Sequence, residues 1–240
     1  MNFKSRPIII EGVNHSGTRL LVDILSCFGS DGGDYNNEWN ENKFFLKLHN
    51  NLIEKISNKG WTDTILNINF IDKYQDNCEF ENYLKKELEI NLLNEFPKLK
   101  DKPWHWKCPT SALFEPTWVN IFPDGWYIIN QREPEKIARA FLRRRASIPF
   151  NDGIKFYKIM EDKILSIKKK KQLIINFDNL NNEINRIADF IPLDVSSQKI
   201  KIARSLIKYN KPLWSKNKSI YMNFKNVYAT YVYNKYKKNK

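Results

Sequence analysis

Two glycines stand five residues apart in a short segment whose residues could hold a phosphate group. Gly12 and Gly17 enclose most of the sequence GVNHSGTR at residues 12–19, which lies between two apolar runs. A tight loop between a buried strand and a helix directs backbone N–H groups and the helix N-terminus to one point, where an anion is stabilised. The spacing therefore predicts a phosphate-binding loop, and the alternative interpretation is a glycine turn without a ligand.

The residues after the second glycine distinguish this loop from a nucleoside-triphosphate loop. That loop reads GxxxxGK followed by Ser or Thr, with the Lys on the terminal phosphates and the hydroxyl on Mg²⁺. Here Thr18 and Arg19 take those positions. A later apolar run ends in Gln131 and Arg132, where a metal-binding NTPase often carries an Asp. We expect phosphate to bind without a metal ion, and we keep a small-molecule kinase as the alternative.

The loop needs a strand before it and a helix after it, and the hydrophobic pattern supplies both. Residues 7–13 are predicted as a buried strand and residues 20–28 as a helix. Further strands are expected at residues 104–107, 126–130 and 172–177, and further helices at 44–56, 79–96, 118–122, 134–145, 154–167, 183–190, 198–208 and from 219 onward. This alternation predicts an α/β fold with a parallel β-sheet flanked by helices, in which ligands bind at the carboxyl ends of the strands.

The length and composition predict a single domain. The chain has 240 residues, of which 42% are hydrophobic and 14% aromatic, enough to bury a sizeable core. Residues 30–100 include a polar, Asn-rich stretch, and we expect them to form a largely helical insertion that carries substrate loops.

The charge is unevenly distributed. The net charge is +13, and residues 1–131 hold 14 basic and 18 acidic side chains, whereas residues 132–240 hold 26 and 9. Such an excess indicates an anionic ligand or partner. A nucleic-acid-binding module is a third hypothesis, but the sequence shows no recognition helix or RNP-like aromatic motif, so we expect no specific nucleic-acid partner. The run Lys168–Lys171 is interpreted as solvated.

Three cysteines, Cys27, Cys78 and Cys108, lie too far apart for a CxxC pair, so neither a disulfide framework nor a metal site is expected. No apolar run reaches the roughly 20 residues of a membrane helix, and the first residues lack a secretory leader pattern. We therefore expect a cytoplasmic protein without a membrane span, and we make no prediction of the oligomeric state.

The phosphate loop and three later segments resemble sulfotransferases. Residues 7–21, PIIIEGVNHSGTRLL, are similar to the 5′-phosphosulfate loop of that family, and residues 106–109, WKCP, are similar to its Lys-x-Pro segment. Residues 121–134, IFPDGWYIINQREP, resemble the family's 3′-phosphate strand, and residues 173–191 resemble the segment that follows it. The Gly-rich loop of the hormone-type enzymes is missing, so the resemblance is closer to the bacterial and Golgi-type branches.

The resemblance implies a P-loop-like sulfotransferase fold and the donor 3′-phosphoadenosine-5′-phosphosulfate (PAPS), with adenosine 3′,5′-bisphosphate as the product. It implies transfer of a sulfuryl group to a hydroxyl or amine acceptor, such as a saccharide or small metabolite, with no metal. Residues 30–100 and the C-terminal segment match none of the family's segments, and we expect acceptor choice to lie there. The donor-binding positions that it implies are Asn14, His15, Ser16, Gly17, Thr18, Arg19, Arg132 and Arg139.

One position departs from the family. The Ser that usually follows the phosphate-binding Arg by eight residues is Ala140 here, and Arg139 or Arg143 is expected to compensate. A non-catalytic nucleotide-binding protein is therefore a further alternative.

The candidate catalytic residues are Lys107, His15, Glu38 and His105. Lys107 is expected to reach the sulfonate, and His15 lies where the family often has Lys or Arg against the bridging oxygen. Glu38 is the favoured general base, and Asp34 and Glu41 are close competitors. His105 is the weaker base candidate because a histidine between two tryptophans is more often a packed residue, and His49 is interpreted as a surface residue.

Overall fold

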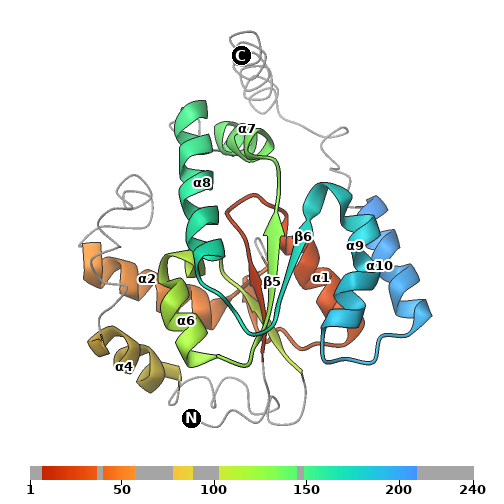
Figure 1. Cartoon of the computed structure of the whole chain (residues 1–240), viewed down its shortest axis with the longest axis horizontal. Helices are drawn as coiled ribbons and strands as arrows, with labels where there is room; N and C mark the ends of the chain where they lie inside the picture. Colours follow the sequence, from red (N-terminus) through yellow and green to blue (C-terminus); the bar gives the residue numbers. More distant parts are fainter. Residues whose placement is uncertain (1–6, 37–39, 58–77, 89–102, 145–148, 210–240) are drawn as a thin grey trace.

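Four parallel strands form the sheet at the centre of the molecule (Figure 1). The structure is a computed structural model that describes residues 7–36, 40–57, 78–88, 103–144 and 149–209. The strands lie in the spatial order β4 (His105–Lys107), β1 (Ile8–Glu11), β5 (Trp126–Gln131) and β6 (Gln172–Asn176). Every neighbouring pair is parallel. The predicted fold class, a parallel β-sheet flanked by helices, is confirmed.

Strand β1 is buried on both of its faces. Successive side chains of a strand point to opposite faces of the sheet, so a strand covered on both sides is apolar throughout. Ile8 and Ile10 pack into the core on one face, and Ile9 packs into the core on the other. The unbroken isoleucine run therefore reflects two layers of helices.

The two helical layers are well separated in Figure 1, with one group on each side of the sheet. One face is covered by α1 (Thr18–Phe28), α9 (Leu180–Phe190) and α10 (Ser197–Tyr209). The other face is covered by α2 (Lys43–Ser57), α4 (Cys78–Glu87), the 3₁₀ helix η4 (Pro109–Phe114), α6 (Glu115–Ile121), α7 (Pro134–Arg144) and α8 (Phe150–Ser166).

The predicted helices and strands are confirmed wherever the structure describes them, with bounds that shift by a few residues. Residues 89–96 of the helix expected at 79–96, and the helix expected from 219, lie outside the described residues. The described elements that were not predicted are the 3₁₀ helices η4 and η5 (Phe177–Asn179), and the short antiparallel pair β2 (Tyr35–Asn36) and β3 (Glu41–Asn42), which lies where we expected loops. None of the described helices is long and apolar enough to cross a membrane.

The strand order makes the carboxyl ends of β1 and β5 the place where a ligand is expected. These strands are neighbours, yet the helix after β1 packs on one face and the helix after β5 packs on the other. In open α/β sheets, ligands bind where the connections diverge in this way. The loop that follows β1 and the residues that follow β5 both lie at this point.

A buried ion cluster fixes the end of β1. The ammonium of Lys169 lies 3.4 Å from the carboxylate of Glu11, the last residue of β1, and 2.7 Å from that of Glu115, the first residue of α6. It also donates hydrogen bonds to the carbonyls of Ile164 and Ile167 at the end of α8. The Lys169 side chain is fully buried, so the prediction that the whole lysine run is solvated is wrong for this residue.

The cluster contains two carboxyl groups and one ammonium. Burial, followed by the nearby Glu115 carboxylate, raises the pKa of Glu11 well above its ordinary value, although Lys169 opposes the change. Burial also raises the pKa of Glu115, against the lowering effects of Glu11 and Lys169. A proton held on Glu11 would leave one carboxylate and one ammonium, which balance each other.

Replacing Lys169 by Met tests how strongly the fold depends on this cluster. We expect Lys169→Met to lower the free energy of unfolding by about 3–5 kcal/mol, because it leaves two buried carboxyl groups without their cation. Protonation of Glu11 or Glu115 relieves that repulsion. Because the pKa of each carboxyl group is raised in the folded state, the folded state becomes more stable relative to the unfolded state as the pH falls. The deficit should therefore be smaller at about pH 5 than at about pH 8.

Urea unfolding of the purified variants provides the measurement. The control is Lys170→Met, since Lys170 makes an exposed ion pair with Asp124 at 3.3 Å. Such pairs stabilise by about 1 kcal/mol or less. Equal losses in the two variants would contradict a special role for Lys169.

Candidate functional site

The loop after β1 leads into a helix whose N-terminus has no side-chain cap. Gly17 is the N-cap of α1, with a φ of 101°, and it has no side chain that could accept hydrogen bonds from the first N–H groups of the helix. The first turn of α1 contains no acidic residue. Because the first N–H groups of a helix have no partner within it, the start of α1 can donate hydrogen bonds to an anion.

Side chains from the end of β5 hold the carbonyl groups of this loop. Asn130 Nδ2 donates to the Ser16 carbonyl at 2.9 Å, and Arg132 Nη1 donates to the His15 carbonyl at 3.1 Å. His15 has a φ of 70°, a left-handed conformation that is uncommon for a residue with a side chain. Its ring packs edge-to-face against Phe141, with centroids 4.7 Å apart. The conformation of the loop is therefore set largely by β5 and α7.

The loop is packed closely on its inner side. A Cβ atom on Gly12 would lie 2.7 Å from the Ser16 hydroxyl and 3.0 Å from the Asn130 carbonyl. A Cβ on Gly17 would lie only 2.1 Å from the ring of Phe177, which follows β6 in the 3₁₀ helix η5 (Phe177–Asn179). Glycine is thus required at positions 12 and 17.

The Ser16 hydroxyl is buried and has no hydrogen-bond partner in the part of the chain that the structure describes.

Arg132 follows β5 directly and has contacts on several sides. Besides the His15 carbonyl, its Nε atom lies 3.5 Å from Oδ1 of Asp178, and its guanidinium carbon lies 4.9 Å from the centroid of the Phe177 ring. The backbone N–H of Arg132 donates to the Tyr157 hydroxyl of α8 at 3.3 Å. The guanidinium is therefore aimed at the loop and is held there by residues of η5.

Lys107 approaches the loop from the opposite side of β1. It is the last residue of β4, pairs in register with Ile10 and forms an ion pair with Glu41 of β3 at 3.0 Å. The Lys107 and Glu41 side chains are only 4% and 15% exposed. Burial lowers the pKa of Lys107; Glu41 opposes this change, and the nearby Arg19 adds to it. Lys107, Glu41 and Arg19 therefore lie close together at the start of α1.

Two asparagines hold Glu41 in place. Asn40 Nδ2 donates to the carboxylate of Asp23 in α1 at 2.8 Å. Asn42 Oδ1 accepts hydrogen bonds from the N–H groups of Phe44 and Phe45, at 3.1 and 3.3 Å, and so caps α2. Neither asparagine was predicted to belong to the site. An Asn directly before an apolar helix is a typical N-cap, and this signal could have identified Asn42.

The predicted donor-binding residues fall into two groups. Residues 14–19 lie in the loop and at the start of α1, beside Arg132. Thr18 is buried in the first turn of α1, and Asn14 is half-buried in the loop. Arg139 lies in the middle of α7 and is half-buried. Glu38, the favoured base, lies outside the described residues, so its role stays a prediction.

Two histidines are core residues. His105 is fully buried in β4, where its Nδ1 atom is 2.9 Å from the Ser30 hydroxyl, and burial lowers its pKa to about 3. It pairs with Ile8, two positions before Lys107 along the sheet, so we do not retain it as a base. The prediction that His49 is a surface residue is wrong. It is fully buried, donates from Nδ1 to the Phe45 carbonyl at 2.6 Å and accepts from Trp118 Nε1 at 3.0 Å.

Among the described residues, no group of three or more His, Cys, Asp or Glu side chains is arranged to hold a metal ion.

Substituting Gly17 tests whether the close approach of Phe177 shapes the loop. Gly17→Ala should destabilise the protein through backbone strain of about 1–2 kcal/mol and through the clash with the ring, which adds about 1–3 kcal/mol. Gly29→Ala is the matched control, because Gly29 has a φ of 104° but its Cβ would meet only the flexible end of Lys199, at 3.1 Å. Chemical unfolding of both variants gives the comparison, and equal losses would show that the ring does not restrict the loop.

Comparisons with known proteins bear on the fold. Neither a protein-family model nor a curated protein sequence matches this chain. The chain is similar to the sulfotransferase domain of the olefin synthase from Synechococcus PCC 7002, with a TM-score of 0.52 and 12% identity over 95% of this chain and 94% of that one. It also matches the sulfotransferase STF1 from Mycobacterium tuberculosis H37Rv, with a TM-score of 0.48 and 13% identity over 84% of this chain and 71% of that one. The first of these likenesses shows that the chain has the α/β fold of a sulfotransferase domain.

Proposed function

We propose that this protein is a sulfotransferase that uses PAPS as its donor. The observation that carries the proposal is the position of two cations on either side of the loop after β1. Lys107 comes from β4 and Arg132 follows β5, and these strands are the two neighbours of β1. A loop with an uncapped helix N-terminus between two cations suits a ligand with separate anionic groups.

The residues present fit such a donor. In this proposal, the N–H groups at the start of α1, together with Asn14, Ser16, Gly17, Thr18 and Arg19, hold its 5′-phosphosulfate. The Ser16 hydroxyl, which is buried and unpartnered among the described residues, supports this assignment, because a buried O–H group normally has a hydrogen-bond partner. Arg132 holds the 3′-phosphate through its planar guanidinium, and Arg139 of α7 is the sequence-based candidate for a further contact.

When bound, the donor supplies the sulfuryl group and leaves as adenosine 3′,5′-bisphosphate. We assign Lys107 to the bridging oxygen on which negative charge develops, with His15 beside it. The Lys107 side chain is 4% exposed, so solvent screens its charge little and its interaction with an anion is strong.

Glu41 is the acid that the structure describes beside Lys107, and we propose it as the general base. Its carboxylate oxygen, 3.0 Å from Lys107 Nζ, accepts the proton that the acceptor's hydroxyl or amine loses as its oxygen or nitrogen attacks sulfur. Glu38, three residues earlier in the chain, is the competing candidate. The acceptor, a saccharide or another hydroxylated metabolite, is assigned to residues 30–100.

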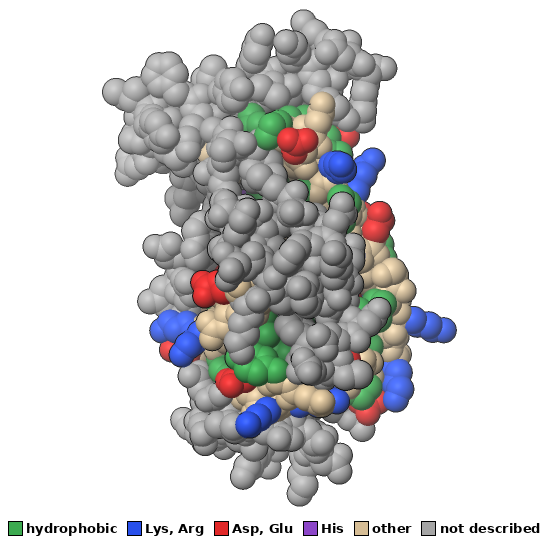
Figure 2. Space-filling model, turned by 90° about the vertical axis from the view of Figure 1, so that its left-hand side faces the viewer, with side chains coloured by type: hydrophobic (Ala, Val, Ile, Leu, Met, Phe, Trp, Pro, Cys, Tyr) green, Lys and Arg blue, Asp and Glu red, His purple; other side chains and the backbone are tan. Residues whose placement is uncertain are grey.

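The other hypotheses have less support. A kinase that binds ATP with Mg²⁺ would need a Lys where Thr18 stands, and no observation in the structure favours it. For nucleic-acid binding, a continuous basic surface would be expected. On the face shown in Figure 2, the described Lys and Arg side chains lie apart, with acidic side chains among them.

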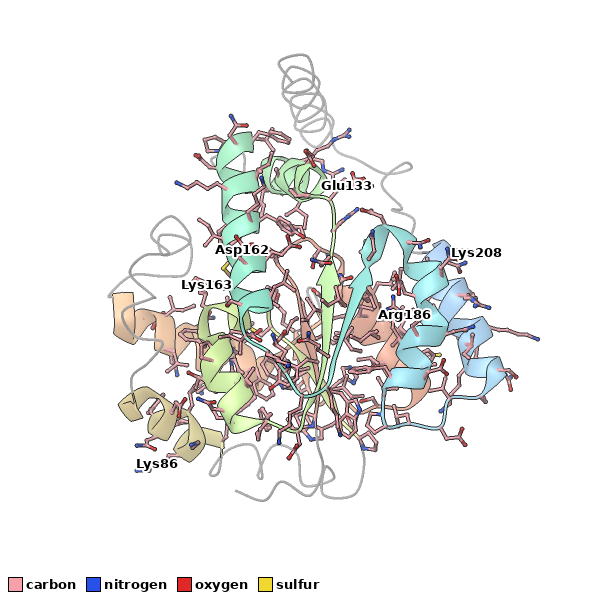
Figure 3. All side chains as sticks on the ribbon, viewed as in Figure 1. Lys86, Glu133, Asp162, Lys163, Arg186 and Lys208 are labelled. Carbon is pink, nitrogen blue, oxygen red and sulfur yellow. The ribbon has the colours of Figure 1, made fainter. Side chains whose placement is uncertain are left out.

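Titration calorimetry with adenosine 3′,5′-bisphosphate tests donor binding. We expect the wild-type protein to bind this nucleotide without Mg²⁺ and to bind it more tightly than ATP. Arg132→Ala should weaken the affinity about 10- to 100-fold, because hydrogen bonds to a charged group are lost. The control is Arg186→Ala on α9, an exposed residue labelled in Figure 3 that pairs with Glu183.

No binding by the wild-type protein, or equal binding by the Arg132 variant, would contradict the proposed donor site. Binding of ATP that requires Mg²⁺ would support the kinase instead.

Turnover of PAPS with a panel of phenols, sugars and amines tests the proposed base. Glu41→Gln should lower kcat about 100- to 10,000-fold with little change in nucleotide affinity, since a positioned base typically contributes that much. Glu54→Gln, on the exposed side of α2, serves as the control. A full loss in Glu38→Gln with normal turnover by the Glu41 variant would assign the base to Glu38.

A further inference from the structure

Asp178 places a carboxylate where the proposed donor site needs to receive a phosphate. Its Oδ1 atom lies 3.5 Å from Arg132 Nε and 3.2 Å from Lys136 Nζ, so two cations converge on one oxygen. Arg132 lies two residues before the start of α7, and Lys136 lies in the first turn of that helix. Such a convergence is the arrangement expected around an oxygen of a bound anion.

The sheet brings these residues together from distant parts of the sequence. Strands β5 and β6 are parallel neighbours, with Gln131 paired to Asn176. Arg132 therefore follows one strand at the level where Phe177 and Asp178 follow the other. Asn176 Oδ1 accepts the N–H of Asp178 at 2.9 Å, which fixes the start of η5.

The cations stand at an unfavourable end of α7. The N-terminus of a helix carries partial positive charge, which disfavours Lys and Arg there. Partial desolvation lowers the pKa of Lys136, but the carboxylates of Asp178 and Glu133 outweigh it and raise the pKa above its ordinary value. Glu133, labelled at the start of α7 in Figure 3, lies 3.3 Å from Lys136. The positive groups at this corner of the sheet are therefore held by acidic neighbours.

Of these two acids, Asp178 is the one that contacts both cations, and Glu133 contacts Lys136 alone in the interactions described. The Asp178 and Arg132 side chains are about one-quarter exposed, so the contact can open to a solute from outside. A phosphate on Arg132 would stand next to the Asp178 carboxylate, and two anions this close repel each other.

We propose that Asp178 is an internal competitor for the phosphate that Arg132 binds, and that Lys136 is the second cation of that subsite. The inference rests on the proposed function, and the ligand class is a phosphomonoester on the ribose 3′-position. Lys136 would then supply the contact that Ala140 cannot make. Asp178 would lower the affinity for the 3′-phosphate while it keeps Arg132 in place before the nucleotide arrives.

Calorimetry at low ionic strength tests the proposal with two nucleotides. Asp178→Asn should tighten binding of adenosine 3′,5′-bisphosphate about three- to tenfold, because a partly exposed like charge is removed. It should change the affinity for adenosine 5′-phosphate, which lacks the 3′-phosphate, by less than about twofold. Lys136→Met should weaken bisphosphate binding, whereas Asp124→Asn, a control at the other end of β5 that pairs with the exposed Lys170, should leave it within about twofold.

A double substitution separates this effect from a general change in stability. In an Arg132→Ala background, Asp178→Asn should have little effect on bisphosphate affinity, because the competition has lost its main cation. Weaker binding of either nucleotide by Asp178→Asn would overturn the proposal and indicate that the carboxylate accepts hydrogen bonds from the ribose. Equal tightening for both nucleotides would also overturn it, since the effect would then not belong to the 3′-phosphate.

Inorganic phosphate distinguishes failure of this inference from failure of the proposed function. If neither nucleotide binds to the wild-type protein, the proposed function fails, but thermal unfolding in increasing phosphate still tests the anion site. Asp178→Asn should then gain more stability from phosphate than the wild-type protein does. An equal gain in both proteins would overturn the role of Asp178.

Discussion

One ammonium group, that of Lys169, joins three elements beneath the candidate site. A charge removed from water is tolerated only where other charges and polar groups surround it. Lys169 meets this requirement through two carboxyl groups and two carbonyls, which belong to β1, to α6 and to the end of α8. Glu11 is the residue directly before Gly12, so the position at which the loop begins is set by this ion cluster as well as by apolar packing.

The loop after β1 and the Arg132 guanidinium beside it hold each other in place. Arg132 donates to the His15 carbonyl, and Asn130 from the same strand donates to the Ser16 carbonyl. With both carbonyls held toward β5, the left-handed conformation of His15 is maintained at the start of α1, which has no side-chain cap. A ligand that draws Arg132 away from the His15 carbonyl would also remove a restraint on the loop. In the proposed donor complex, binding at Arg132 and binding at the loop would therefore be coupled.

Local patterns were sufficient to predict the strands, the position of the loop between β1 and α1, and the cations at the strand ends. The apolar run of β1, the glycine spacing and the positions of Lys107 and Arg132 all depend on neighbours within a few residues. The errors concern side chains whose partners are remote. Four consecutive lysines look alike in sequence, and only the fold brings Glu11 and Glu115 to Lys169. His49 depends likewise on Trp118, which lies 69 residues further along the chain.

Residues 40–42 belong to the polar stretch that was hardest to interpret from sequence. Their contacts show how polar side chains can fix the position of a neighbouring residue. Successive side chains of an extended segment point in opposite directions. Asn42 turns toward the Gly32 carbonyl, 2.8 Å away, and caps α2, so Glu41 must point the other way, toward Lys107. Asn40 ties the same segment to the first turns of α1 through Asp23. The position of the proposed base therefore follows from a helix cap and a strand alternation, so substitutions at Asn42 would act on Glu41 without touching a substrate.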